Sequence, residues 1–160
     1  LYIEGLRDIA EDERIHANKV KVQIIGRREL LPQDVNEAID YAETKTADYD
    51  EYVFTVCLAY GSREEMLNAI QSIAAEHAAG DLPLNAIDET AVSTRLYTGE
   101  MPDPDLVIRT SGEERISNFL LWQMAYSELY FTDVYWPSFQ KKDLLKAVRT
   151  SQDRRRRYGE

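Results

Sequence analysis

The chain has 160 residues, 44% of them hydrophobic, which is long enough for one domain with a sizeable core. Its formal net charge of −10 argues against a general nucleic-acid-binding protein. Cys57, the single cysteine, excludes an intrachain disulfide, and no run reaches the roughly 18 to 20 apolar residues of a membrane span, so we expect a cytoplasmic protein that can still contact a membrane at its periphery.

The first third of the chain predicts helix, strand and helix in turn. Apolar residues at helical spacing predict a helix over Leu1 to Ala17, and this pattern begins without an initiator Met or an N-cap, so we expect that an N-terminal portion is not included. The β-branched run Val20 to Ile25, which ends at Gly26, predicts a strand. Pro32 then opens a helix that we expect to continue to about Thr46.

The continuous apolar run Tyr52 to Tyr60 predicts a strand that is buried on both faces, as a parallel sheet requires. Gly61 permits a tight turn, and Ser62 is expected to cap a helix that continues to about Ala79. Arg63, in this turn, is either an ordinary residue of the helix surface or part of a site.

The remaining elements are shorter. Asp88 can cap a short helix that ends near Tyr97, and a loop rich in Pro and Gly then leads into a strand. The later predicted elements are a strand over Asp105 to Arg109, a helix from Asn118, a short strand around Leu129 to Phe131 and a final helix from Asp143.

Strands that alternate with helices predict an α/β fold with a mainly parallel sheet flanked by helices and joined by right-handed crossovers. No internal repeat, low-complexity tract or long linker divides the chain. We therefore expect a single domain over residues 1–160.

Two arginines near the end of the third predicted strand are the strongest candidates for a binding site. Arg109 ends the strand, a Thr-Ser-Gly turn follows, and Arg115 lies just before Ser117 and Asn118, either of which could cap the next helix. Unpaired N–H groups at a helix start and two guanidinium forks would together bind a phosphorylated ligand. The alternative is that both arginines pair with Glu113, Glu114 or another acid and only hold a loop in place.

The segment after these arginines is rich in aromatic residues. It holds eight of the sixteen aromatics of the chain, and most of these rings are expected in the core. Glu128 is different, because a carboxylate among apolar neighbours needs a cation, a metal or a hydrogen-bond partner.

Residues 108–139, with the sequence IRTSGEERISNFLLWQMAYSELYFTDVYWPSF, closely resemble the C-terminal signature of the cis-prenyltransferases, the undecaprenyl diphosphate synthase family. Tyr60-Gly61-Ser62-Arg63 is similar to the family's Tyr-Gly-Gly-Arg block, although Ser62 replaces a Gly. Arg157-Tyr158-Gly159 is similar to the family's C-terminal Arg-x-Gly motif, which reaches the partner's active site across a dimer.

The resemblance implies a Mg²⁺-dependent condensation of isopentenyl diphosphate with an allylic prenyl diphosphate to give a Z-polyprenyl diphosphate. It implies that Glu128 helps to bind Mg²⁺ and that the protein is a homodimer. The diphosphate-binding residues that it implies are Arg109, Arg115, Ile116 (through its backbone), Ser117, Arg63, Arg157 and Gly159.

The family's N-terminal Met-Asp-Gly-Asn-x-Arg block, which supplies the catalytic Asp, has no counterpart in the sequence. The resemblance therefore implies no catalytic residue here, and we expect this segment alone to be inactive. The main alternative is a non-catalytic partner subunit of a heteromeric cis-prenyltransferase, which would lack the diphosphate-binding arginines. A generic phosphate-binding α/β module is a second alternative. An all-helical trans-type prenyl synthase would carry Asp-Asp-x-x-Asp motifs, and the sequence has none.

Overall fold

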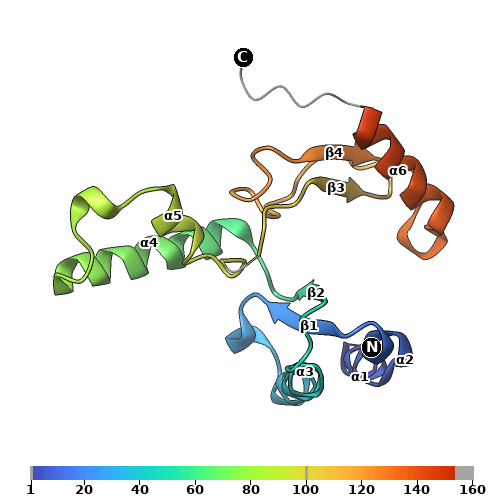
Figure 1. Cartoon of the computed structure of the whole chain (residues 1–160), viewed down its shortest axis with the longest axis horizontal. Helices are drawn as coiled ribbons and strands as arrows, with labels where there is room; N and C mark the ends of the chain where they lie inside the picture. The colour runs from blue at the N-terminus through green and yellow to red at the C-terminus, as the bar shows by residue number, and fades with distance from the viewer. Residues whose placement is uncertain (1, 100, 154–160) are drawn as a thin grey trace. The chain divides into compact units, whose positions relative to one another are not determined.

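The computed structural model of the chain describes residues 2–99 and 101–153. The chain forms two compact units, Leu1–Gly99 and Glu100–Glu160, which are described in turn (Figure 1). Each unit contains one pair of parallel strands. The expectation of a single domain over residues 1–160 stays a prediction.

The first unit begins with two helices, α1 (Tyr2–Glu11) and α2 (Glu13–Ala17), where the sequence predicted one. The helix is interrupted at Asp12, which has an extended backbone and accepts a hydrogen bond from the Arg14 N–H at 2.8 Å. Asp is a favoured N-cap, and this side chain starts a new helix instead of continuing the old one. The prediction of one uninterrupted helix was therefore wrong.

A parallel strand pair and one crossover helix form the core of the first unit. β1 (Val20–Ile25) pairs with β2 (Tyr52–Cys57) in a register that places Val20 beside Tyr52. They are joined through η1 (Arg28–Leu30) and α3 (Gln33–Lys45), and α3 packs against α1. The buried core residues come from α1, β1 and α3 and are Leu6, Ala10, Val22, Ile24, Val35, Ala38, Ile39 and Ala42.

The second strand is shorter and more exposed than the sequence predicted. β2 ends at Cys57, because Ala59 has a φ of 48° and an extended strand cannot continue through a left-handed residue. The first residues of β2, Tyr52, Val53 and Phe54, are 64%, 51% and 43% exposed. The prediction of a strand buried on both faces was therefore wrong. The core helices cover β1, and β1 is the strand that pairs with β2.

α4 (Ser62–Ala79) follows. Its N-cap is Gly61, whereas the sequence predicted Ser62 as the cap. Its end near Ala79 is confirmed, with Gly80 in the left-handed conformation that commonly ends helices. After η2 (Leu84–Ala86) comes α5 (Glu89–Ser93), which is shorter than expected. The predicted cap is confirmed, since Asp88 accepts a hydrogen bond from the Ala91 N–H at 2.8 Å.

A fully buried carboxylate stabilises the start of α4. Glu65 has no exposed surface, and it accepts hydrogen bonds from the Tyr60 hydroxyl at 2.5 Å and from the Tyr97 N–H at 2.8 Å. Burial and this carboxylate raise the pKa of the Tyr60 hydroxyl. They also raise the pKa of the Cys57 thiol to about 11, which keeps the thiol protonated at neutral pH.

The second unit contains β3 (Leu106–Arg109) and β4 (Glu128–Phe131), which are parallel and place Leu106 beside Glu128. η3 (Trp136–Ser138) and α6 (Lys141–Asp153) follow. Both strands were expected, and α6 begins two residues earlier than predicted. Within the described ranges 2–99 and 101–153, no helix is both long and apolar enough to cross a membrane.

The helix expected from Asn118 is not formed. Ser117, Asn118 and Leu120 have φ values of 53°, 61° and 45°, which belong to the left-handed region and cannot extend a right-handed helix. The chain instead makes a series of turns between β3 and β4, with hydrogen bonds such as Met124 N–H to the Leu120 carbonyl at 2.9 Å. The predicted helix was therefore wrong.

Candidate functional site

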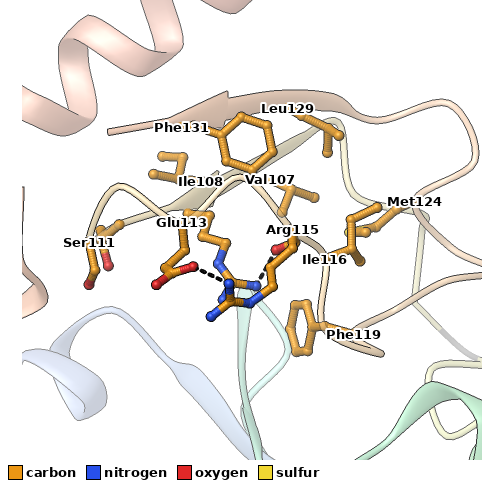
Figure 2. A pocket seen from close by; sticks show the side chains of 12 residues that line it. Val107, Ile108, Ser111, Glu113, Arg115, Ile116, Phe119, Met124, Leu129 and Phe131 are labelled. Atoms are coloured by element: carbon orange, nitrogen blue, oxygen red, sulfur yellow. Dashed lines mark hydrogen bonds and ion pairs between the residues drawn. The ribbon is translucent and has the colours of Figure 1, made fainter. Parts of the chain in front are cut away.

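A pocket of about 340 Å³ lies in the second unit, beside the strands β3 and β4 (Figure 2). Its apolar wall comes from both strands and from the turns between them and consists of Val107, Ile108, Ile116, Phe119, Met124, Leu129 and Phe131. Its polar rim consists of Arg109, the last residue of β3, and of Ser111, Glu113 and Arg115 in the loop that follows. The pocket therefore combines an apolar wall with a cationic rim.

Arg109 holds the loop in place through hydrogen bonds of its side chain. It is the last residue of β3, and its Nη1 donates a hydrogen bond to the Arg115 carbonyl and another to Ser117 Oγ at 3.1 Å. Three of the residues that the sequence selected, Arg109, Arg115 and Ser117, are thus brought together. The guanidinium fixes the shape of the loop that carries the second arginine.

Arg115 lies at the exposed edge of the same loop. Its Nη1 is 2.5 Å from Glu113 Oε2, and the two side chains are 68% and 41% exposed. Figure 2 shows the two side chains facing each other above Phe119. An ion pair this exposed contributes little to stability, so a ligand with more negative charge than one carboxylate can replace Glu113.

These contacts agree with the alternative hypothesis from the sequence, that the two arginines hold a loop in place. They are also compatible with ligand binding by Arg115, whose side chain is accessible at the pocket rim. In this loop Arg109 stabilises the fold and Arg115 faces solvent.

The backbone of the loop differs from the expected helix start. Ser111 and Gly112 have left-handed φ values of 72° and 70°, and their N–H groups donate to the Val134 and Thr132 carbonyls at 3.0 and 2.9 Å. These amides are therefore used within the protein. Because no helix begins at Asn118, the unpaired N–H groups expected from a helix start do not form there.

Glu128 is not part of this pocket. It is the first residue of β4 and pairs with Leu106, whereas Arg109 pairs with Phe131 three positions further along. At about 3.3 Å per residue, Glu128 lies roughly 10 Å along the strands from Arg109. Among the residues that the structure describes, no group of three His, Cys, Asp or Glu side chains could hold a metal ion.

The other predicted site residues are not among those that line the pocket. Arg63 is the second residue of α4 and belongs to the first unit. Arg157 and Gly159 lie outside the described residues.

The sequence did not assign Met124 or the apolar residues of β3 to a site. Their spacing could not distinguish a pocket wall from an ordinary core. The pairing of β3 with β4 and the turns between these strands bring these side chains to the pocket.

Residues 3–159 match a protein-family model described as "Putative undecaprenyl diphosphate synthase". A Pyrococcus horikoshii protein named tritrans,polycis-undecaprenyl-diphosphate synthase (geranylgeranyl-diphosphate specific) is 49% identical over 99% of this chain and 60% of its own length. A Methanopyrus kandleri protein of the same name is 51% identical over 98% of this chain and 58% of its own length. The chain therefore spans about three fifths of the length of these curated relatives.

Two solved structures are similar to this one. The lavandulyl diphosphate synthase of Lavandula x intermedia, in complex with dimethylallyl diphosphate, is 37% identical with a TM-score of 0.94 over 99% of this chain and 68% of that chain. A "probable undecaprenyl diphosphate synthase" of Campylobacter jejuni is 29% identical with a TM-score of 0.84 over 98% of this chain and 70% of that chain. These matches confirm the predicted fold class, an α/β protein with parallel strands and flanking helices.

Proposed function

The chain belongs to the undecaprenyl diphosphate synthase family, and on this premise we propose that the protein elongates prenyl diphosphates with isopentenyl diphosphate to give Z-polyprenyl diphosphates. The observation that carries the proposal is the pocket beside β3, where an accessible arginine lies at the rim of an apolar wall. An isoprenoid diphosphate has the same division into an anionic head and an apolar tail.

In this proposal the two arginines have different tasks. Arg115 exchanges the single carboxylate of Glu113 for the diphosphate, which offers more charge and more acceptor oxygens. Arg109 and Ser117 keep the loop in the conformation that presents Arg115 and the backbone of Ile116. The C–O bond of the allylic diphosphate breaks and inorganic diphosphate is released, a C–C bond forms to the terminal alkene carbon of isopentenyl diphosphate, and one proton of isopentenyl diphosphate is released to solvent.

The names of the relatives suggest the allylic substrate. The Pyrococcus and Methanopyrus proteins are both described as specific for geranylgeranyl diphosphate, and both are about half identical to this chain. We propose the same allylic substrate here. Competition among dimethylallyl, geranyl, farnesyl and geranylgeranyl diphosphates for elongation tests this choice, and a preference for a shorter primer would contradict it.

Magnesium remains a proposal that the pocket itself does not support. Mg²⁺ commonly uses one or two carboxylates together with substrate phosphate oxygens, so the single carboxylate of Glu128 is chemically suitable. However, Glu128 lies at the strand end away from Arg109, and the described residues do not assemble a metal site around the pocket. Glu128→Gln should raise the Mg²⁺ concentration needed for half-maximal turnover, and an unchanged requirement would exclude the role.

Three further residues complete the proposal. Arg63 would contact a diphosphate, and Arg157 with Gly159 would act in the site of a partner within a homodimer. Sedimentation equilibrium tests the homodimer, since a monomer at working concentration would remove the basis for that tail contact.

The experiment that tests the proposed function first measures binding. Isopentenyl diphosphate is titrated calorimetrically into the 160-residue chain and into Arg115→Ala. Losing charge-assisted hydrogen bonds to the diphosphate should weaken binding by roughly tenfold or more. Arg14→Ala is the matched control, because Arg14 is also exposed and also pairs with an acid two residues earlier, Asp12 at 2.6 Å. Equal effects of the two substitutions would contradict the pocket assignment.

Turnover is then measured on the protein as its host expresses it, with radiolabelled isopentenyl diphosphate and an allylic primer. Incorporation into Z-polyprenyl products that is lost in Arg115→Ala supports the enzyme. A protein that incorporates nothing alone but stimulates an active partner would instead be the accessory subunit.

A further inference from the structure

The last helix of the described chain has one buried side and one strongly basic side. α6 packs beside β3 and β4 through Ala147, which has no exposed surface (Figure 1). On another side of the helix, Lys142, Leu145, Lys146 and Arg149 follow at positions i, i+3, i+4 and i+7, which form one continuous stripe. Val148 and Gln152 border this stripe.

This stripe, here called the α6 basic face and consisting of Lys142, Leu145, Lys146, Val148, Arg149 and Gln152, is open to solvent. Leu145 is 56% exposed and Val148 is 37% exposed. Within residues 2–99 and 101–153, no acid forms an ion pair with the three cations of this face. Among the described residues, the face therefore offers three cations without an ion-pair partner around accessible apolar groups, and one exposed acid, Asp153, lies on the same side four residues after Arg149.

The charge of this region is opposite to that of the chain. The whole chain carries a net charge of −10, but α6 (Lys141–Asp153) contains four Lys or Arg residues and two Asp residues. Surface charges are screened beyond about 8 Å at physiological ionic strength. A partner that touches the α6 basic face is therefore attracted by the local cations more than it is repelled by distant acids.

We propose that the α6 basic face docks the protein onto the surface of an anionic lipid bilayer. Lys142, Lys146 and Arg149 would contact the lipid phosphates while Leu145 and Val148 enter the boundary between headgroups and acyl chains. Basic residues with apolar neighbours on one side of a helix are the features of helices that lie in a membrane interface. The docking does not depend on the proposed function, although such an enzyme would release a lipid product.

A second copy of the chain suits this face less well. In a two-fold symmetric dimer the same patch meets itself, so the cations of one copy would face those of the other. The exposed large apolar side chains of α6 in the described residues are three, Leu144, Leu145 and Val148, whereas a stable interface buries about 800 Å² on each partner. A bilayer supplies opposite charge and an apolar layer at the same time.

The test is co-sedimentation of the chain with vesicles. Vesicles of phosphatidylcholine alone are compared with vesicles that also contain phosphatidylglycerol. We expect binding only to the anionic vesicles, with binding that weakens as salt is added. Binding to both vesicle types with equal strength would overturn the electrostatic part of the proposal.

Matched substitutions locate the contact. Lys142→Gln with Lys146→Gln should lower the vesicle affinity by roughly tenfold or more, whereas Lys19→Gln with Lys21→Gln should leave it unchanged. Leu145→Gln should lower affinity, whereas Leu67→Gln on α4, a leucine that is also 56% exposed, should not. Unchanged thermal unfolding of all four variants shows that they remain folded. Equal losses in test and control variants would overturn the proposal.

A measurement of the oligomeric state distinguishes membrane docking from the remaining explanation, a protein–protein interface on this face. If Leu145→Gln dissociates a dimer and the chain does not bind anionic vesicles, the face is a protein interface and the proposal is wrong. If the chain binds anionic vesicles and Leu145→Gln leaves the oligomeric state unchanged, the proposal is supported.

Discussion

At the scale of single residues, the two arginines of the pocket differ in what holds them. Arg109 is fixed by two acceptors of the loop, the Arg115 carbonyl and Ser117 Oγ. Arg115 pairs with one exposed carboxylate, that of Glu113. Both bonds of Arg109 come from Nη1 at the end of the long arginine side chain, so reach and orientation matter at the first position, whereas a point charge can satisfy much of the second.

This difference predicts that a lysine at position 109 impairs ligand binding more than a lysine at position 115. Arg109→Lys should weaken binding of isopentenyl diphosphate by about tenfold, because the shorter lysine side chain cannot reach both loop acceptors with the same geometry. Arg115→Lys should weaken it less. Calorimetric titration of both variants measures the order, and a larger loss for Arg115→Lys would show that Arg109 does not shape the site.

At the scale of elements, the β1–β2 pair depends on a close backbone approach just after β1. Gly26 has a φ of 127°, and a Cβ at this position would lie 1.9 Å from the Leu58 carbonyl oxygen. That oxygen is a backbone atom and cannot move away cheaply. Glycine is required here both for its φ and for its lack of a side chain.

Gly26→Ala should therefore lower the free energy of unfolding by about 2 kcal/mol or more, from backbone strain and from the clash. Gly5→Ala is the matched control. Gly5 lies inside α1 with nothing within 4 Å of an added Cβ, so alanine should raise stability by about 0.5 to 1 kcal/mol. Urea unfolding followed by circular dichroism measures both changes, and a neutral Gly26→Ala would show that the turn can relax.

At the scale of the whole molecule, carboxylates paired with arginines set how stability depends on pH. Hydrogen bonds from Arg95 lower the pKa of Glu76 from 4.5 to about 2. Hydrogen bonds from Arg14 lower the pKa of Asp12 from 3.8 to about 2. Both groups hold fewer protons in the folded chain than in the unfolded chain between these values.

Their contribution to stability is therefore fully present above about pH 4.5 and is lost as the pH falls toward 2. The midpoint of thermal unfolding should decrease through this window. Glu76→Gln and Arg95→Gln should each make the decrease shallower, because each removes the same pair. An unchanged slope in both variants would show that the pair does not contribute.

Much of the local structure could be predicted from the sequence. β1 begins and ends at the predicted residues, because Val20 to Ile25 is β-branched and Gly26 ends it. The end of α4 and the Asp88 cap depend on local backbone preferences and were also predicted. The break at Asp12 was missed, because an Asp can be either a helix surface residue or a cap.

The sequence by itself determined the parallel α/β fold class and the group of Arg109, Arg115 and Ser117, because periodicity and short spacing are local properties. The tertiary structure decided which residues are left-handed after Arg115, how far β2 is exposed, and that Glu128 lies away from the arginines. These features depend on strand register and on which faces other elements cover. Register and coverage arise from contacts between distant residues, and no local pattern records them.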